Sequence, residues 1–342
     1  MAKKTVKVLI LLLFAVTVFA DYQMPSIHTS IMLDSKFYSG NQANKGNYDN
    51  DNRFQVRKAA VEIEGEINEY LEYTFEFGLS TCIGKGAELK VMDAGIAYNL
   101  NENISFGLQQ GHVLRGFASI TDCRERLTIE KPIFQKTFGT CHPTGFVADA
   151  FFELSEYSDI EIELALLNGT NGTLTKEHDY NIGAIYNTPL PGLGFSGSYT
   201  MTNSLNYYDE NYQQYDDRGY RANFGIRYEP ADFHFSTEYY LGEGFQKSDQ
   251  EMEAYYVQSG YAIQINHARL QYIEPYVMYE FWNKDKGSDV DSEYGYVNCG
   301  LVASLSEAVK LKFNYQEEIK HPGNGAVAHT PSSFIMRLQF GL

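Results

Sequence analysis

Basic side chains are concentrated in residues 112–145, a stretch that interrupts an otherwise repetitive sequence. Guanidinium and ammonium groups bind anions through charge-assisted hydrogen bonds that replace part of the water around the anion. A group of such side chains at the narrow point of a passage would favour anions there. The basic residues of this stretch are Arg115, Arg124, Arg126, Lys131 and Lys136.

The segments that flank this stretch alternate apolar and polar residues. In residues 70–80, YLEYTFEFGLS, every second residue from Leu71 to Leu79 is apolar, while Glu72 and Glu76 occupy alternate positions. Side chains of a strand point to opposite faces with a period of two, so one face is apolar and the other carries carboxylates. One such strand fits a soluble sandwich as well as a membrane barrel. A long series of them favours the barrel.

About sixteen segments show this alternation, and an even number is typical of single-chain bacterial barrels. The links between them alternate between short turns and long loops, such as Pro230-Ala231 and Asn203 to Arg218, which is typical of the two ends of an outer-membrane barrel. The predicted strands are 26–38, 54–67, 70–80, 92–100, 103–111, 145–154, 159–168, 179–188, 192–202, 219–229, 232–242, 252–264, 271–283, 292–305, 308–318 and 332–342.

The N-terminus is typical of an export signal. Lys3, Lys4 and Lys7 precede an apolar run that ends at Val18-Phe19-Ala20, so residues 1–20 are predicted to be a signal peptide and 21–342 an outer-membrane barrel. The 342-residue chain has a formal charge of -17, which argues against nucleic acid as a partner. Export permits disulfides, but the pairing of Cys82, Cys123, Cys141 and Cys299 stays open, free thiols included.

The inward face of the predicted strands carries both signs of charge. Acidic candidates are Glu62, Glu64, Glu72, Glu76, Asp93, Glu161, Glu163, Glu238, Glu274 and Glu280, and basic candidates are Lys58, Arg221, Arg227, Lys310, Lys312 and Arg337. The wall is therefore predicted to be net acidic and the 112–145 stretch locally basic. Inward glycines, Gly78, Gly95, Gly107 and Gly183, leave space and favour an open lumen.

The sequence resembles the phosphate-selective porins of the O and P type. The similarity is carried by RKAAVEIEGEINEYLEYTFEFG, VMDAGIAYNLNENISFGLQQG, FGIRYEPADFHFSTEYYLGEG, AYYVQSGYAI and LSEAVKLKFNYQ, in this order. The resemblance implies a sixteen-stranded transmembrane antiparallel β-barrel, usually a homotrimer in outer-membrane lipid, with a water-filled pore. It also implies that residues 112–145 fold into the lumen and constrict it. Within them, Ser119 to Glu130 is predicted to form a short helix with Thr121 as its N-cap.

The predicted function is passive diffusion of small hydrophilic solutes or ions across the outer membrane, with anions such as phosphate among the candidates. The alternatives are an outer-membrane barrel enzyme and a plugged structural or adhesive barrel. The eight His, among them His112 and His142, are dispersed, with no catalytic or metal-ligating spacing. No enzyme activity, cofactor or metal is therefore expected.

Overall fold

The described chain consists almost entirely of antiparallel strands. The computed structural model describes residues 24–38, 53–80, 88–135, 142–168, 178–208, 214–243, 251–267, 269–287, 292–320 and 332–341. The predicted signal peptide lies outside these residues, as do Lys136, Cys82 and Cys141. In the described ranges no helix is long and apolar enough to cross a membrane.

The described part of the chain contains seventeen strands and one short helix, α2 (Phe117–Ile120), joined by turns and irregular segments. The strands are β1 (Ser26–Tyr38), β2 (Arg53–Asn68), β3 (Leu71–Ser80), β4 (Glu88–Asn101), β5 (Ile104–Gln110), β6 (Thr144–Ser155), β7 (Ser158–Leu167), β8 (Asp179–Asn187), β9 (Leu193–Tyr208), β10 (Gln214–Tyr228), β11 (Phe233–Glu243), β12 (Glu251–Tyr261), β13 (Ile263–His267), β14 (Leu270–Asn283), β15 (Glu293–Ser306), β16 (Val309–Lys320) and β17 (Ser333–Gly341).

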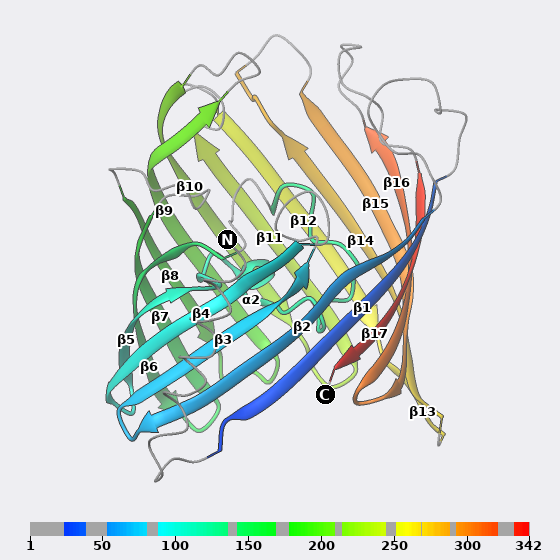
Figure 1. Cartoon of the computed structure of the whole chain (residues 1–342). Helices are drawn as coiled ribbons and strands as arrows, with labels where there is room; N and C mark the ends of the chain where they lie inside the picture. The colour runs from blue at the N-terminus through cyan, green and yellow to red at the C-terminus, as the bar shows by residue number, and fades with distance from the viewer. Residues whose placement is uncertain are drawn as a thin grey trace.

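The strands close into a ring in which each strand pairs with its neighbours in sequence (Figure 1). The ring closes where β1 pairs with β17, with Leu33 opposite Leu338 and Asp34 opposite Arg337. β12 and β13 both pair with β14, through Gly260 opposite Tyr276 and then Ile263 opposite Ile273. β12 and β13 therefore occupy the same position in the ring. The seventeen described strands thus form a closed barrel with sixteen strand positions, as predicted.

The polarity of the strands is that of a membrane barrel, apolar outside and polar inside. Along β8, Asp179, Asn181 and Gly183 are buried, while Tyr180 and Ile182 are about half exposed, at 52% and 49%. On β3, Glu76 is 5% exposed. Charges on the lipid-facing side of a barrel are costly at the bilayer midplane. The predicted orientation of the alternating segments is therefore the observed one.

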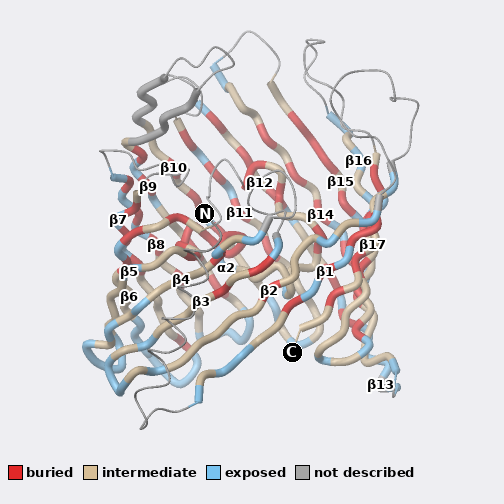
Figure 2. The backbone as a smooth tube through the Cα atoms, in the orientation of Figure 1, coloured by how far each residue is buried: buried red, intermediate tan, exposed pale blue. Residues whose placement is uncertain are grey.

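Short turns connect neighbouring strands at the lower end of the barrel, where many positions are exposed (Figure 2). Asn68 accepts hydrogen bonds from the Tyr70 and Leu71 amides at 2.9 and 3.1 Å, which fixes the β2–β3 turn. One predicted long link was wrong. β9 and β10 extend through most of the segment from Asn203 to Arg218, with Tyr208 opposite Gln214.

Candidate functional site

Residues 112–135, which follow β5, fold into the barrel lumen, as predicted, rather than forming an external loop. We call residues 112–135 the lumen segment. Glu163 on β7 accepts a hydrogen bond from the Leu114 amide at 2.9 Å, and Glu280 on β14 accepts one from the Ile133 amide at 2.6 Å. Glu238 on β11 accepts hydrogen bonds from two amides at the start of α2, at 2.7 and 2.9 Å. These carboxylates anchor the segment through its backbone N–H groups.

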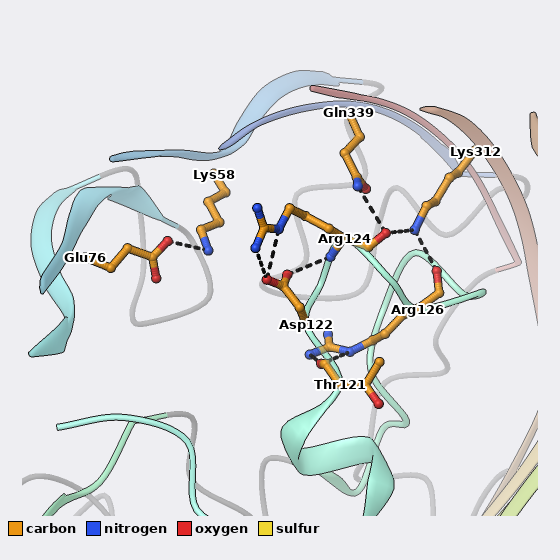
Figure 3. Close-up of polar contacts among 8 residues, drawn as sticks. All are labelled: Lys58, Glu76, Thr121, Asp122, Arg124, Arg126, Lys312 and Gln339. Carbon is orange, nitrogen blue, oxygen red and sulfur yellow. Dashed lines mark hydrogen bonds and ion pairs between the residues drawn. The ribbon is translucent and has the colours of Figure 1, made fainter. Parts of the chain in front are cut away.

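Side chains of β16 and β17, across the ring from β7, hold backbone carbonyls of the same segment (Figure 3). The Lys312 ammonium on β16 donates to the Arg124 and Arg126 carbonyl oxygens at 3.2 and 2.6 Å. The amide of Gln339 on β17 donates to the Arg124 carbonyl at 3.1 Å. Arg337 on β17 donates to the Ile129 carbonyl at 2.8 Å. Because strands on opposite sides of the ring bind it, the segment crosses the lumen.

Apolar side chains fix the lumen segment against the β11–β15 wall. Phe134 is fully buried, and its ring lies 5.0 Å from that of Tyr240 and 6.4 Å from that of Tyr256. The surrounding cluster also contains Met252, Met278 and Trp282. A second cluster packs Leu114 and Phe117 against Ile185 on β8. Burial of several large side chains stabilises this arrangement by a few kcal/mol for each fully buried one.

The predicted helix from Ser119 to Glu130 was wrong. α2 is a single turn, and Thr121 is its C-cap, whose amide and hydroxyl both donate to the Phe117 carbonyl, at 3.0 and 2.7 Å. Gly116 precedes the helix with a φ of 99°, and an added Cβ there would lie 2.0 Å from a Glu238 oxygen. Beyond Thr121 the chain forms a turn in which the Glu125 and Arg126 amides donate to the Asp122 carbonyl, and the carbonyls of Arg124, Arg126 and Ile129 accept hydrogen bonds from wall side chains instead of continuing the helix.

The basic residues of the lumen segment differ in their surroundings. Arg124 forms an ion pair with Asp122 at 2.8 Å, and the Arg126 guanidinium donates to the Thr121 carbonyl at 2.8 Å. Arg115 is 3% exposed, and Lys131 is half-buried. Burial lowers the pKa of Arg115, opposed by the negative charges of Asp179 and Glu163. The basic stretch is therefore largely engaged with the barrel and with itself.

Asp122 and Arg124 shift each other's pKa in the direction that keeps both charged. Burial would raise the pKa of the Asp122 carboxyl, but hydrogen bonds from the Arg124 amide and guanidinium, together with the charges of Arg124 and Lys58, lower it. Burial would lower the pKa of Arg124, and the hydrogen bond and charge of Asp122 raise it. The lumen segment thus presents a fixed ion pair toward Lys58 on β2 (Figure 3).

Several of the predicted wall residues are paired across neighbouring strands. Lys58 and Glu76 form an ion pair at 2.6 Å, and Glu72 accepts a hydrogen bond from Asn99 at 2.6 Å. Asp93 contacts His142 at 2.6 Å. Glu161 is half-buried on β7.

The remaining basic wall residues lie on β10, β16 and β17. The Arg221 guanidinium donates to the carbonyls of Tyr220 and Glu243. Arg227 lies 4.5 Å from the centre of the Phe117 ring. A hollow of about 310 Å³ lies between the lumen segment and the walls. Its acidic and basic lining residues are Glu125, Arg126, Arg227, Glu229, His234, Glu274 and Lys310.

The missing side chain of Gly183 does not leave open space in the lumen, contrary to the prediction. A Cβ at this position would lie 2.3 Å from the Leu114 carbonyl oxygen, so the missing side chain lets the lumen segment approach β8. We expect Gly183→Ala to destabilise the protein by about 1–3 kcal/mol, as overpacking does. The unfolding midpoint in urea measures this. Gly287→Ala is the matched control, because nothing lies within 4 Å of its added Cβ; equal stability of the two variants would contradict the docking.

Sequence reasoning missed two features of the interior. Glu163, Glu238 and Glu280 were predicted as pore-wall charges, whereas they bind backbone amides of the lumen segment. His112 and His142, dispersed in sequence, lie with their rings 4.8 Å apart. Because the two histidines are some 30 residues apart in sequence, their spacing does not predict this proximity. They are close because the two ends of the segment between them meet in the fold.

Comparisons with known proteins agree with this architecture. Residues 34–148 match the model of the family described as phosphate-selective porin O and P. No curated protein matches the chain in sequence. The trimer form of OmpT, an outer-membrane protein of Vibrio cholerae, is a structural neighbour at 10% identity with a TM-score of 0.61, covering 94% of this chain and 100% of its own.

Two further solved structures have the same fold. The outer-membrane channel DcaP of Acinetobacter baumannii is 10% identical, with a TM-score of 0.64 and coverage of 93% of this chain and 97% of its own. An anion-selective porin from Comamonas acidovorans is 10% identical, with a TM-score of 0.59 and coverage of 93% and 99%. The chain therefore has the closed β-barrel fold of these outer-membrane porins. The predicted resemblance to the phosphate-selective porins O and P is confirmed over residues 34–148.

Proposed function

We propose that the protein is a channel for passive diffusion of small hydrophilic solutes or ions across the outer membrane, with the lumen segment as its narrowest part. The observation that carries this proposal is the attachment of one segment to both sides of a closed barrel. Wall carboxylates bind its amides and wall cations bind its carbonyls. A segment held across the lumen in this way narrows a wide barrel and leaves its interior polar. A narrowed polar interior is typical of a porin rather than of an enzyme.

We propose a modest preference for anions rather than strict selectivity for phosphate. Three of the wall carboxylates, Glu163, Glu238 and Glu280, accept hydrogen bonds from backbone amides of the lumen segment. They therefore repel anions less than the number of acidic residues in the wall would indicate. Lys310, Arg126 and Arg227 line the hollow between the segment and the walls, and Glu125, Glu229 and Glu274 offset them. Charges at the narrow part of a pore act on partly dehydrated ions and dominate its selectivity.

Reversal potentials across planar bilayers in a KCl gradient test this preference. The wild-type protein should give the sign expected for excess Cl⁻ permeation. Lys310→Glu should shift the potential toward cations, most strongly in dilute salt, because screening is weakest there. Lys286→Glu, at an exposed turn after β14, is the matched control and should change the potential little. A cation-selective wild type would overturn the proposed preference, and the absence of any conductance would overturn the channel itself.

We further propose that the protein assembles as a homotrimer in outer-membrane lipid. The support is its likeness in fold to the trimer form of OmpT. The apolar outer face, with side chains such as Ile182 and Tyr180 about half exposed in the single chain, would contact lipid or a neighbouring copy.

A further inference from the structure

Three potential metal ligands come together where the lumen segment joins the wall. His112 follows β5, His142 precedes β6, and Asp93 lies on β4 beside them. One ligand atom from each side chain lies within 4.8 Å of the other two. The Gly111 amide donates to the Pro143 carbonyl at 3.1 Å, so the two ends of the intervening chain already meet at this place.

The backbone presents His142 in an uncommon conformation. Its φ is 108°, in a region of backbone conformation that non-glycine residues rarely adopt. This conformation places the His142 ring against Asp93, with Nδ1 2.6 Å from Oδ1, and 4.8 Å from the ring of His112. A rarely adopted conformation of this kind is typical of sites where the orientation of a side chain has a function.

The chemistry of the three groups suits a divalent transition metal. Two imidazoles and a carboxylate are ligands of Zn²⁺, and a tetrahedral ion would leave one position for water. Asp93 and His112 also line a hollow of about 210 Å³, which gives an ion access.

We propose that Asp93, His112 and His142 form a divalent transition-metal site that fastens the two ends of the segment between β5 and β6 to the barrel wall. Zn–ligand distances near 2.1 Å require the three donors to move closer together by small side-chain rotations. The hydrogen bond between His142 and Asp93 is then replaced by two bonds to the ion. The site would stabilise the folded barrel whenever metal is bound, because the unfolded chain keeps the three ligands apart.

Calorimetric titration of the purified, metal-free protein in detergent with ZnCl₂ tests the site. The wild type should bind one Zn²⁺ per chain and show a raised thermal midpoint, whereas MgCl₂ should do neither, since Mg²⁺ requires oxygen ligands. Asp93→Asn and His142→Gln should each weaken Zn²⁺ binding by at least about tenfold, the scale on which even outer-shell partners act. His234→Gln is the matched control, because His234 also contacts a carboxylate, Glu274, outside this group.

A measurement on the wild type alone keeps the proposal testable if a variant fails to fold. Co²⁺ in place of Zn²⁺ should give the visible absorption of a four-coordinate site with nitrogen and oxygen ligands. The proposal would be overturned by a wild type that binds neither ion, or by His234→Gln weakening Zn²⁺ as much as His142→Gln. Because these readouts measure binding and not conductance, failure here would leave the proposed channel untouched, and failure of the channel would leave the metal site untouched.

Discussion

Arg337→Met is expected to destabilise the barrel by about 3–5 kcal/mol, the cost of removing one partner of a buried ion pair. Arg337 is 1% exposed, and its guanidinium donates to both oxygens of Asp34 at 2.7 and 2.8 Å. A third hydrogen bond runs to the Ile129 carbonyl at 2.8 Å. The substitution leaves the Asp34 carboxylate without its counter-charge at the seam where β1 meets β17, and it releases the lumen segment from that wall.

The midpoint of urea unfolding, followed by the fluorescence of Trp282, measures this effect. Trp282 is the single Trp of the chain and is buried against Tyr294 in the cluster that surrounds Phe134. The double variant Asp34→Leu/Arg337→Met is the control, because it removes the buried charge as well and should recover most of the lost stability. Arg337→Lys should not substitute, since an ammonium cannot form the paired contacts of the guanidinium. A stable Arg337→Met protein would contradict the buried pair.

Glu238→Gln is expected to loosen the lumen segment and raise the single-channel conductance. Glu238 is 1% exposed and accepts hydrogen bonds from the amides of Phe117 and Ala118 and from the hydroxyls of Tyr240 and Tyr256. All of these groups are donors, so a glutamine NH₂ group would face donors on at least one side. Hydrogen bonds to a charged group contribute about 1.5–3 kcal/mol each, and the loss of even one should shift the segment toward an undocked state.

Glu229→Gln is the matched control for this variant. Glu229 also lies at the hollow, but its contact is a 3.6 Å ion pair with Arg227 and its side chain is 40% exposed. Exposed pairs contribute about 0–1 kcal/mol, so the control should keep the wild-type stability and a docked lumen segment. The lost charge at the hollow can shift its ion preference, but it should not produce the larger, noisier steps expected of Glu238→Gln. Equal conductance of Glu238→Gln and the wild type would show that the carboxylate does not hold the constriction.

The alternation of side chains made the barrel predictable, whereas the lumen segment was not predictable in detail. Period-two patterns fix which face of each strand meets lipid, because a polar side chain outside and an apolar one inside are both costly. The first strand was therefore placed at 26–38, as observed for β1. Glu76 and Lys312, which the same rule assigns to the inner face, are 5% and 1% exposed.

The local structure of residues 112–135 depends on partners that are distant in sequence. Thr121 is a residue type that favours a helix start, yet the chain beyond it is held in another conformation by hydrogen bonds from Lys312, Gln339 and Arg337 to its carbonyls. These contacts span 186 to 215 residues. Pattern reasoning on neighbouring residues cannot anticipate them, and for the same reason it did not bring Asp93 and the two histidines together.

The most direct test of the account is the single-channel conductance of the wild-type protein beside that of Glu238→Gln in the same bilayer and salt. We expect stable open steps from the wild type and larger, noisier steps from the variant, because the docked lumen segment narrows an open pore. A wild type that stays closed while the variant conducts would show that the segment is a plug, and would contradict a diffusion channel.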